Sequence, residues 1–344
     1  MGVQSVSKKE LKDYRLTKRV AIYAVEAIIL IFLIIMSLGS GSVNYSAKEI
    51  LMALSGQGDS VSRVIVREIR IPRTVSAILV GSNIAIAGAL LQAVLKNPLA
   101  APGIIGVTSG ASLAAVTIML VFPALTYFVP FAAFFGGILA TFLVFALAWK
   151  KGTGVNAVRI VLAGVALNAI LGGGTSLLSI LYSDRIQGIL MWVNGSLAGN
   201  TWIDVQTLLP YTVVGFIVAL FLSDIANLLQ LGDSNAVSLG VKLNQARIIL
   251  SITAAFLTGI SVAIAGIIGF VGLIIPHISR LLVGSNYRFL IPSCALLGAS
   301  LLVLADMVAR TIFAPIELPV GLIMAVSGGP FFLYLLKKVG REGY

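Results

Sequence analysis

Four arginines lie close together near the end of a polar stretch: Arg63, Arg67, Arg70 and Arg73. A guanidinium group binds a carboxylate through two parallel hydrogen bonds, so the cluster suits the recognition of acidic groups. Spacings of four, three and three residues would place all four side chains on one face of a helix. The charge alone is equally compatible with lipid headgroups and with the carboxylates of an external partner.

Acidic side chains at two other positions could also support ionic chemistry. Asp306 and Arg310 are four residues apart, a spacing at which helical side chains pair and so lower the cost of charge near lipid. A purely structural ion pair is the simpler interpretation. Glu26 is a lone acid in the first apolar run, and we expect it to pair with Arg19 or to reach the membrane interface.

Catalytic motifs are absent from the sequence. It contains no G-x-x-x-x-G-K-[ST] phosphate loop, no H-E-x-x-H and no G-x-S-x-G element. The single histidine, His277, cannot form a metal site by itself, and the single cysteine, Cys294, excludes an internal disulfide. We therefore expect a chain that is not an enzyme and that binds no metal or other cofactor directly.

The elements that position these residues must be membrane-spanning helices. The chain of 344 residues is 58% hydrophobic and 11% charged, with a mean hydropathy of +1.04. Soluble domains usually carry about 25% charged residues. Lipid leaves no backbone group unsatisfied, so apolar runs of this length predict an all-α polytopic membrane protein. The net charge of +11 is spread between the apolar runs, which argues against a nucleic-acid partner.

Hydropathy predicts about ten spans in a single transmembrane domain covering 1–344, and Pro72 suits the first turn of the second span. The expected spans are 20–38, 74–94, 104–122, 128–148, 160–181, 207–223, 247–265, 267–283, 291–313 and 319–336. With the N-terminal segment 1–19 inside, the inner segments hold 17 of the 24 Lys and Arg residues and the outer segments hold 7. The positive-inside rule then places both termini, including the tail at 337–344, in the cytoplasm.

Short sequence echoes indicate an inverted internal repeat that relates spans 2–5 to spans 7–10. IAIAG at 84–88 returns as VAIAG at 262–266, and GASLAA at 110–115 returns as GASLLV at 298–303. The two halves would cross the membrane in opposite directions, as in many transporters that alternate their access. Among the inner loops, 224–247 is long enough to form two short helices divided around Gly240, and KNPLAAPG at 96–103 ends the second span.

Four segments together closely resemble the permease subunits of iron–siderophore, haem and cobalamin importers. These permeases are the transmembrane subunits of type II ATP-binding-cassette (ABC) importers. The segments are RIPRTVSAILVGSNIAIAGALLQAVLKNPLAAPGIIGVTSGA (70–111), GFVGLIIPHISRL (269–281), CALLGASLLVLADMVAR (294–310) and ELPVGLIMAVSGGPFFLYLL (317–336). The resemblance covers about 20–338 and implies a multi-pass protein of the bacterial plasma membrane.

The resemblance also implies partners and site residues. An external substrate-binding protein would present glutamates to Arg70, Arg73 and Arg310. Two separate ATPase subunits, which bind Mg and hydrolyse ATP, would contact the coupling helices at 224–247. The permease itself would form a dimer with a second copy or with a paralogue. The expected coupling contacts are Leu231, Gly232, Ala236, Leu239 and Gly240, and the expected inner gate is Asn97, Leu99, Ala157 and Val158.

The sequence departs from the family pattern at the gate, because some members carry small hydroxyl residues where Ala157 and Val158 stand. The cargo is not identified, since an iron–siderophore, haem and cobalamin would all be lined by ordinary apolar side chains. The alternative function is an ion-coupled secondary transporter of a small solute. That alternative needs an essential acid within the membrane, and Glu26 is its candidate.

Overall fold

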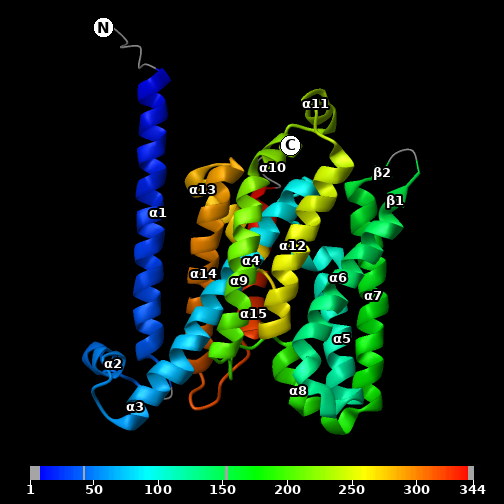
Figure 1. The fold of residues 1–344 in the computed structure, drawn as a ribbon. Coiled ribbons are helices and arrows are strands. Elements are labelled where there is room, and N and C mark those ends of the chain that lie inside the picture. Colours follow the sequence, from blue (N-terminus) through cyan, green and yellow to red (C-terminus); the bar gives the residue numbers. More distant parts are fainter. Residues whose placement is uncertain (1–7, 42, 152–153, 340–344) are drawn as a thin grey trace.

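The computed structural model describes residues 8–41, 43–151 and 154–339 of the chain, and these are almost entirely helical (Figure 1). The all-α class predicted from composition is therefore confirmed. The ends of the two predicted cytoplasmic segments, 1–7 and 340–344, lie outside the described residues.

Ten helices occupy the positions of the predicted spans. Within the described residues, seven helical segments are long and apolar enough to cross a membrane, and α5, α13 and α15 are shorter apolar helices, so the count of ten spans stays a prediction. The helices are α1 (Lys8–Gly39), α4 (Ile71–Leu95), α5 (Val107–Val121), α6 (Val129–Ala148), α7 (Ala157–Leu181), α9 (Trp202–Phe221), α12 (Leu243–Ala265), α13 (Val271–Val283), α14 (Tyr287–Thr311) and α15 (Val320–Val339).

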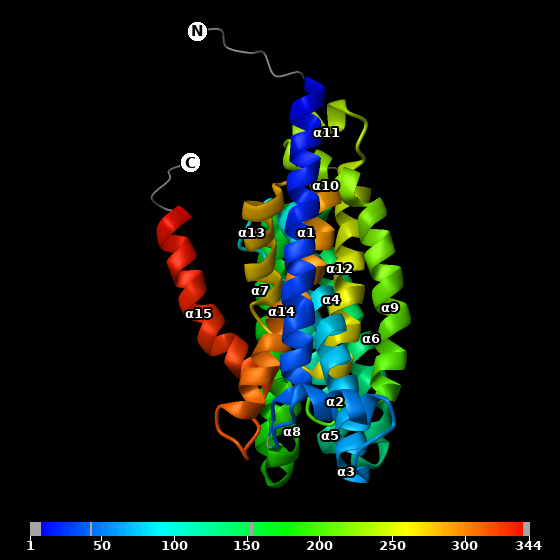
Figure 2. The same cartoon turned by 90° about the vertical axis from the view of Figure 1, so that its left-hand side faces the viewer.

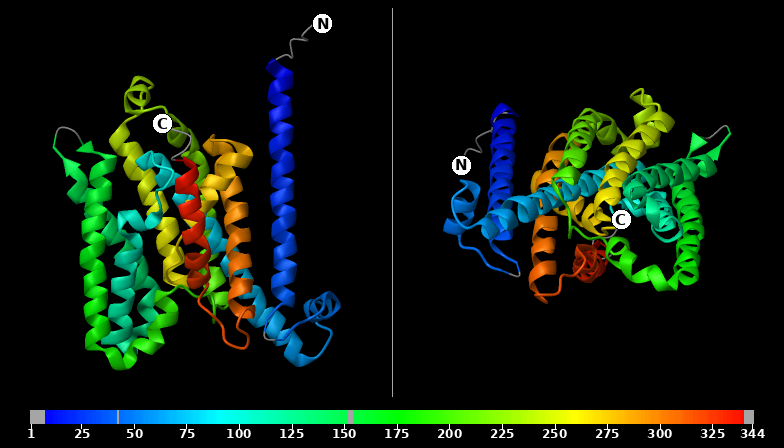
Figure 3. Two further views of the ribbon diagram at one scale, coloured as in Figure 1. Left: turned by 180° about the vertical axis from the view of Figure 1, so that it is seen from behind. Right: turned by 60° about the horizontal axis from the view of Figure 1, so that its bottom comes forward.

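Helix α4 lies in the centre of the bundle, packed against α9, α12, α13 and α14 (Figure 1). Glycines allow its backbone to approach its neighbours closely. A Cβ atom at Gly88 would lie 1.8 Å from the carbonyl oxygen of Gly272 in α13, and Gly81 similarly faces Gly298 of α14. Helix α1 stands at one edge of the bundle, while α5, α6 and α7 form the other side (Figure 3).

Short elements cover the two ends of the bundle. The α2–α3 end carries α2 (Ala47–Leu54), α3 (Ser60–Val64) and α8 (Ile186–Val193), with turns η3 (Pro123–Phe128) and η4 (Ser183–Arg185) nearby. The α10–α11 end carries α10 (Ser223–Gln230), α11 (Asp233–Ser238), the antiparallel pair β1 (Trp149–Lys150) and β2 (Gly154–Val155), and turn η2 (Pro102–Ile105) on that side of the bundle. Helix α1 begins and α15 ends toward the α10–α11 end (Figure 2). Which end faces the cytoplasm stays a prediction.

Pro72 lies in the first turn of α4, as the sequence predicts. The chain is already helical before it, however, because one continuous helical segment runs from Ser60 to Leu95, and its π-helical part, η1 (Ile65–Arg70), ends two residues before the proline. The amide of Ile71 bonds to the carbonyl of Val66, five residues back. Proline lacks an N–H, and a change of hydrogen-bond register beside it lets the helix continue through this point.

The second sequence echo lies inside a helix in both halves, α5 and α14, but the first has different local structures. Residues 84–88 lie in the middle of α4, whereas 262–266 end α12, where Gly266 takes a φ of +67°. Helices α4 and α12 do run in opposite directions along the bundle (Figure 1). The inverted repeat is compatible with this arrangement and stays a prediction.

Candidate functional site

A buried ionic cluster lies at the α2–α3 end, formed by Arg73, Asp306, Arg310 and Glu317. Arg73 of α4 donates to both carboxylate oxygens of Asp306 at 3.0 Å and to Glu317 at 2.6 Å. The predicted pair of Asp306 with Arg310 is present, but its atoms are 3.7 Å apart. The shorter ion pair links α4 to α14 over 233 residues of sequence, so no local spacing could have indicated it.

Arg70 is buried at the same end without a carboxylate partner among the described residues. Its guanidinium donates to the carbonyl oxygen of Leu38 at 2.6 Å and to that of Val43, and it lies 4.9 Å from the ring centre of Tyr45. Carbonyl oxygens satisfy its donors but do not neutralise its charge. A buried cation that lacks a counter-ion is energetically unfavourable, which makes Arg70 the member of the arginine set best suited to receive an acid from outside.

The four clustered arginines differ in burial, and the prediction that they share one helix face stays a prediction. Arg67 is exposed and Arg63 half-buried, whereas Arg70 and Arg73 are buried. The wider π-helical turn between them changes the angular spacing on which the prediction rested. The backbone of Arg67 also accepts a 3.0 Å hydrogen bond from the indole of Trp202, which ties α9 to this segment.

The three predicted docking residues are buried within the chain. The exposed fractions of Arg70, Arg73 and Arg310 are 5%, 6% and 3%. Arg310 donates to the backbone and hydroxyl oxygens of Ser37, so it also holds α1 against α14. The structure thus gathers the three arginines at one end, and their docking role stays a prediction.

The segment 224–247 forms two short helices, as predicted, but they are divided at Gly232 rather than at Gly240. Gly232 has φ +97° and ψ 156°, a conformation that favours glycine. Gly240 instead ends α11: its amide bonds to Val237 and the amide of Val241 bonds to Ala236. These two bonds, with φ +85° at Gly240, are the Schellman arrangement that ends many helices.

Helix α11 projects beyond its neighbours α9, α10 and α12 (Figure 1). Leu231 and Leu239 are 53% and 60% exposed, and Val237 is exposed beside them, whereas Ala236 is buried. The projecting apolar surface therefore consists of Leu231, Val237 and Leu239, which we call the apolar knob. Sequence reasoning placed Ala236 among the coupling contacts, but this side chain is buried within the chain. The coupling role of the segment stays a prediction.

Asp233 ties the base of α11 to the bundle. It accepts hydrogen bonds from Lys96, which follows α4, and from Arg247 of α12 at 2.9 Å. Partial burial opposes ionisation, but the bonds from Lys96 and Arg247 outweigh it and lower the pKa of Asp233. Lys96 and Asp233 are 137 positions apart, which is why the sequence did not reveal this link.

The predicted gate residues lie in two separate places. Lys96 adopts a left-handed conformation that ends α4, and the side chain of Asn97 accepts the Leu99 amide at 2.9 Å. Asn97 lines a pocket with His277 and Arg280, and neither Ala157 nor Val158 lines it. Val158 is exposed at the start of α7, where Asn156 caps the helix through a 2.8 Å bond.

The inner gate and the absence of a directly bound cofactor both stay predictions. Among the described residues, no group of three or more His, Cys, Asp or Glu side chains could hold a metal ion. The prediction that the chain binds no cofactor directly is not tested by that finding.

The comparisons with known proteins give a consistent result. The Fe(3+)-citrate import system permease protein YfmE of Bacillus subtilis is 39% identical over 92% of this chain and 94% of its own length. The hemin transport system permease protein HmuU of Yersinia pestis is 37% identical over 90% and 94%. A solved structure described as an inward-facing conformation of a metal-chelate type ABC transporter superposes with a TM-score of 0.79 at 31% identity, covering 92% of this chain and 99% of that one. The sequence profile of the FecCD transport family matches residues 29–338. The chain therefore belongs to the FecCD transport family, the group of importer permeases that its motifs resemble.

Proposed function

We propose that the chain is the permease subunit of an ABC importer that carries a metal chelate across the bacterial plasma membrane. The single observation that supports this most strongly is the 0.79 TM-score to a metal-chelate type ABC transporter over almost the whole of both chains. Relatives named for Fe(3+)-citrate and for hemin support a bulky chelate as cargo. Within that class we propose an iron–siderophore, with haem or cobalamin as the other candidates.

The proposed work is divided between the two ends of the molecule. At the α2–α3 end, an external binding protein docks its carboxylates on Arg70, Arg73 and Arg310, with the exposed Arg67 at the margin. Arg70 is the principal acceptor, because its charge has no carboxylate partner among the described residues. At the α10–α11 end, the apolar knob enters a groove on the ATPase subunit, as amphipathic helices do elsewhere.

A second copy, or a paralogue, completes the translocation pathway. Helix α7 supports this, because few of its side chains are covered within one chain. Cβ atoms at Gly172 and Gly173 would have no heavy atom within 4 Å, which leaves room for a helix from outside. We propose that this face lines the pathway between two permeases. Closure of the ATPases would then move the coupling helices and switch access from one side to the other.

Reconstitution tests this function. The permease is placed in liposomes with an ATPase subunit and a binding protein encoded beside it, and uptake of labelled iron chelates, haem and cobalamin is measured with internal ATP. We expect uptake of one chelate only when all three components and ATP are present. Movement of the cargo by the permease alone would contradict the proposal.

Orientation is tested separately with cysteine labelling. Cys294 is buried, so it gives little background. In wall-stripped cells, an impermeant maleimide should modify Glu68→Cys at the α2–α3 end and should leave Ser234→Cys in α11 unmodified. The reverse pattern would place the proposed docking surface in the cytoplasm and overturn the assignment of both partners.

An ion-coupled transporter remains the rival function, and Glu26 is its candidate acid. The structure pairs Glu26 with Ser293 of α14 at 2.6 Å and not with Arg19, which instead donates to the carbonyl of Val283. Helix α1 lies at the edge of the bundle (Figure 3), far from α7. Loss of uptake in Glu26→Gln together with transport that needs no ATPase would favour the rival.

A further inference from the structure

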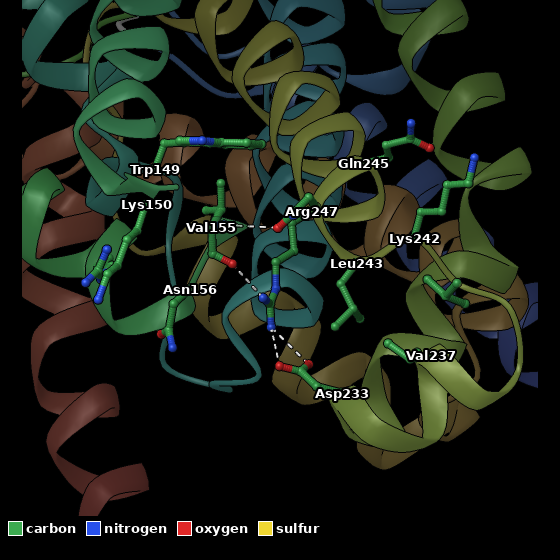
Figure 4. Close-up of a pocket in the computed structure, with 13 residues that line it drawn as sticks. Trp149, Lys150, Val155, Asn156, Asp233, Val237, Lys242, Leu243, Gln245 and Arg247 are labelled. Atoms are coloured by element: carbon green, nitrogen blue, oxygen red, sulfur yellow. Dashed lines mark hydrogen bonds and ion pairs between the residues drawn. The ribbon is translucent and has the colours of Figure 1, made fainter. Parts of the chain in front are cut away.

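A basic pocket opens at the α10–α11 end between the β1–β2 hairpin, α11 and the start of α12 (Figure 4). Its volume is about 740 Å³. Four basic side chains line it, Lys150, Arg159, Lys242 and Arg247, against the single acid Asp233.

Most of this charge is not neutralised within the chain. Arg247 is occupied by Asp233 and by the carbonyl of Val155 at 2.7 Å. No hydrogen bond or ion pair engages Lys150, Arg159 or Lys242 in the part of the chain that the structure describes. The Nε of the buried Arg247 also has no acceptor there, which is costly unless one is supplied from outside. The pocket therefore favours an anionic ligand.

An apolar cavity of about 470 Å³ continues from the basic pocket along α6 and α12. The two cavities share Trp149 and Val155 in their linings. The apolar cavity is otherwise lined mainly by Ile138, Phe142, Phe145, Ile248 and Ile252. Seven residues separate Trp149 from Phe142, so the cavity extends about 10 Å along α6 toward the middle of the span.

We propose that the two cavities together bind one anionic phospholipid. The phosphate headgroup lies beside Lys150 and Arg159, next to Trp149, and an acyl chain lies in the apolar cavity; Lys242 lies on the opposite side of the pocket (Figure 4). Trp149 stands between them, at the depth where indole rings favour the boundary between headgroups and hydrocarbon. A soluble phosphate would make no use of the apolar cavity, and a zwitterionic lipid would leave the unpaired cations uncompensated. Basic pockets of this kind between membrane helices recognise anionic headgroups.

Native mass spectrometry of the full chain in detergent tests the headgroup. After delipidation, we expect one phosphatidylglycerol to bind at least tenfold more tightly than phosphatidylcholine with the same acyl chains. Lys150→Gln and Arg159→Gln should each weaken binding about fivefold, and Lys242→Gln, across the pocket, should weaken it less. Lys18→Gln, an exposed lysine on α1 that faces the same end, is the matched control and should bind as the unmodified chain does. Equal retention of both lipids would overturn the proposal.

Filling the apolar cavity tests the acyl chain. Ala146→Trp should reduce phosphatidylglycerol binding, whereas Leu147→Trp, exposed on α6 outside the cavity, should not. Displacement of the lipid by millimolar inorganic phosphate, with Ala146→Trp without effect, would show a site for free phosphate and refute the proposal. If the triple glutamine variant kept the lipid but lost only its ATPase subunit, the pocket would be a protein-docking site and the proposal would likewise fail.

Discussion

The three buried arginines at the α2–α3 end differ in the partners that their side chains bind within the chain. Arg73 is satisfied by two carboxylates, Arg310 shares one of them, and Arg70 has only carbonyl acceptors. The same residue type in one cluster therefore has different consequences when it is replaced. Sequence alone gives the three residues equal weight, because the acids that distinguish them come from α14 and from the segment before α15.

Replacement of Arg70 tests the docking role. Arg70→Gln keeps a donor for the carbonyls of Leu38 and Val43 but removes a charge that lacks a counter-ion in the chain. We expect little loss of folding stability and an affinity for the binding protein at least about thirtyfold weaker, or ~2 kcal/mol. Surface plasmon resonance on the detergent-solubilised importer measures the affinity. Unchanged affinity would refute the role of Arg70.

Replacement of Arg73 tests whether the ionic cluster stabilises the fold. It leaves the buried carboxylate of Asp306 with only the distant Arg310, so we expect about 3 kcal/mol of destabilisation, seen as a lower Tm. A stable Arg73→Gln variant would show that the ionic cluster does not hold α4 and α14 together.

Sequence reasoning located the helices better than their junctions. The apolar runs gave the positions of the ten helices because hydropathy detects a run apolar enough to cross the membrane, whether it faces lipid or, like α4, is buried in the bundle. The division of 224–247 was placed at Gly240 instead of Gly232, and the helical segment before Pro72 was not predicted, since both depend on backbone hydrogen bonds that leave no simple trace in composition. Long-range pairs, such as Glu26 with Ser293, were missed because nothing in either local sequence specifies the partner.

At the scale of elements, the packing of α4 against α13 depends on the absence of side chains. Gly88→Ala would place a Cβ 1.8 Å from the Gly272 carbonyl oxygen, so the helices must separate. We expect a loss of about 1–3 kcal/mol, measured as a lower Tm in detergent. Gly172→Ala in α7 is the matched control, because its Cβ would meet no atom within 4 Å and Ala is the better helix former. Equal Tm values for both variants would contradict the packing argument.

The attachment of α11 is expected to depend on pH. Because the folded-state pKa of Asp233 is lowered, its stabilising contribution is complete above the ordinary value of 3.8 and disappears as the pH falls through the folded value. Asp233→Asn should therefore speed amide hydrogen exchange in α11 at pH 7. The difference in unfolding free energy between the two proteins should narrow as the pH falls below 3.8. A difference that stays constant from pH 7 to well below 3.8 would exclude this ionic link.

On the scale of the whole molecule, one helical segment connects the two proposed docking surfaces. Residues 60–95 run from the arginines at the α2–α3 end to Lys96, which contacts Asp233 at the base of α11. At 1.5 Å per residue this segment is about 54 Å long, and it is buried along most of its length. A movement imposed at either end can therefore reach the other without passing through a flexible loop.

The apolar knob is where the proposed link to the ATPase can be broken without disturbing the fold. Leu239→Asp changes a side chain that is 60% exposed, so the Tm of the permease should stay within about 1 °C. We expect chelate uptake in liposomes to fall at least tenfold, while ATP hydrolysis by the ATPase no longer responds to the loaded binding protein. Leu16→Asp, at a side chain that is 51% exposed on α1, is the control for adding an acid and should leave hydrolysis coupled to the binding protein. Normal uptake by Leu239→Asp would show that the ATPase subunit does not contact the permease through the apolar knob.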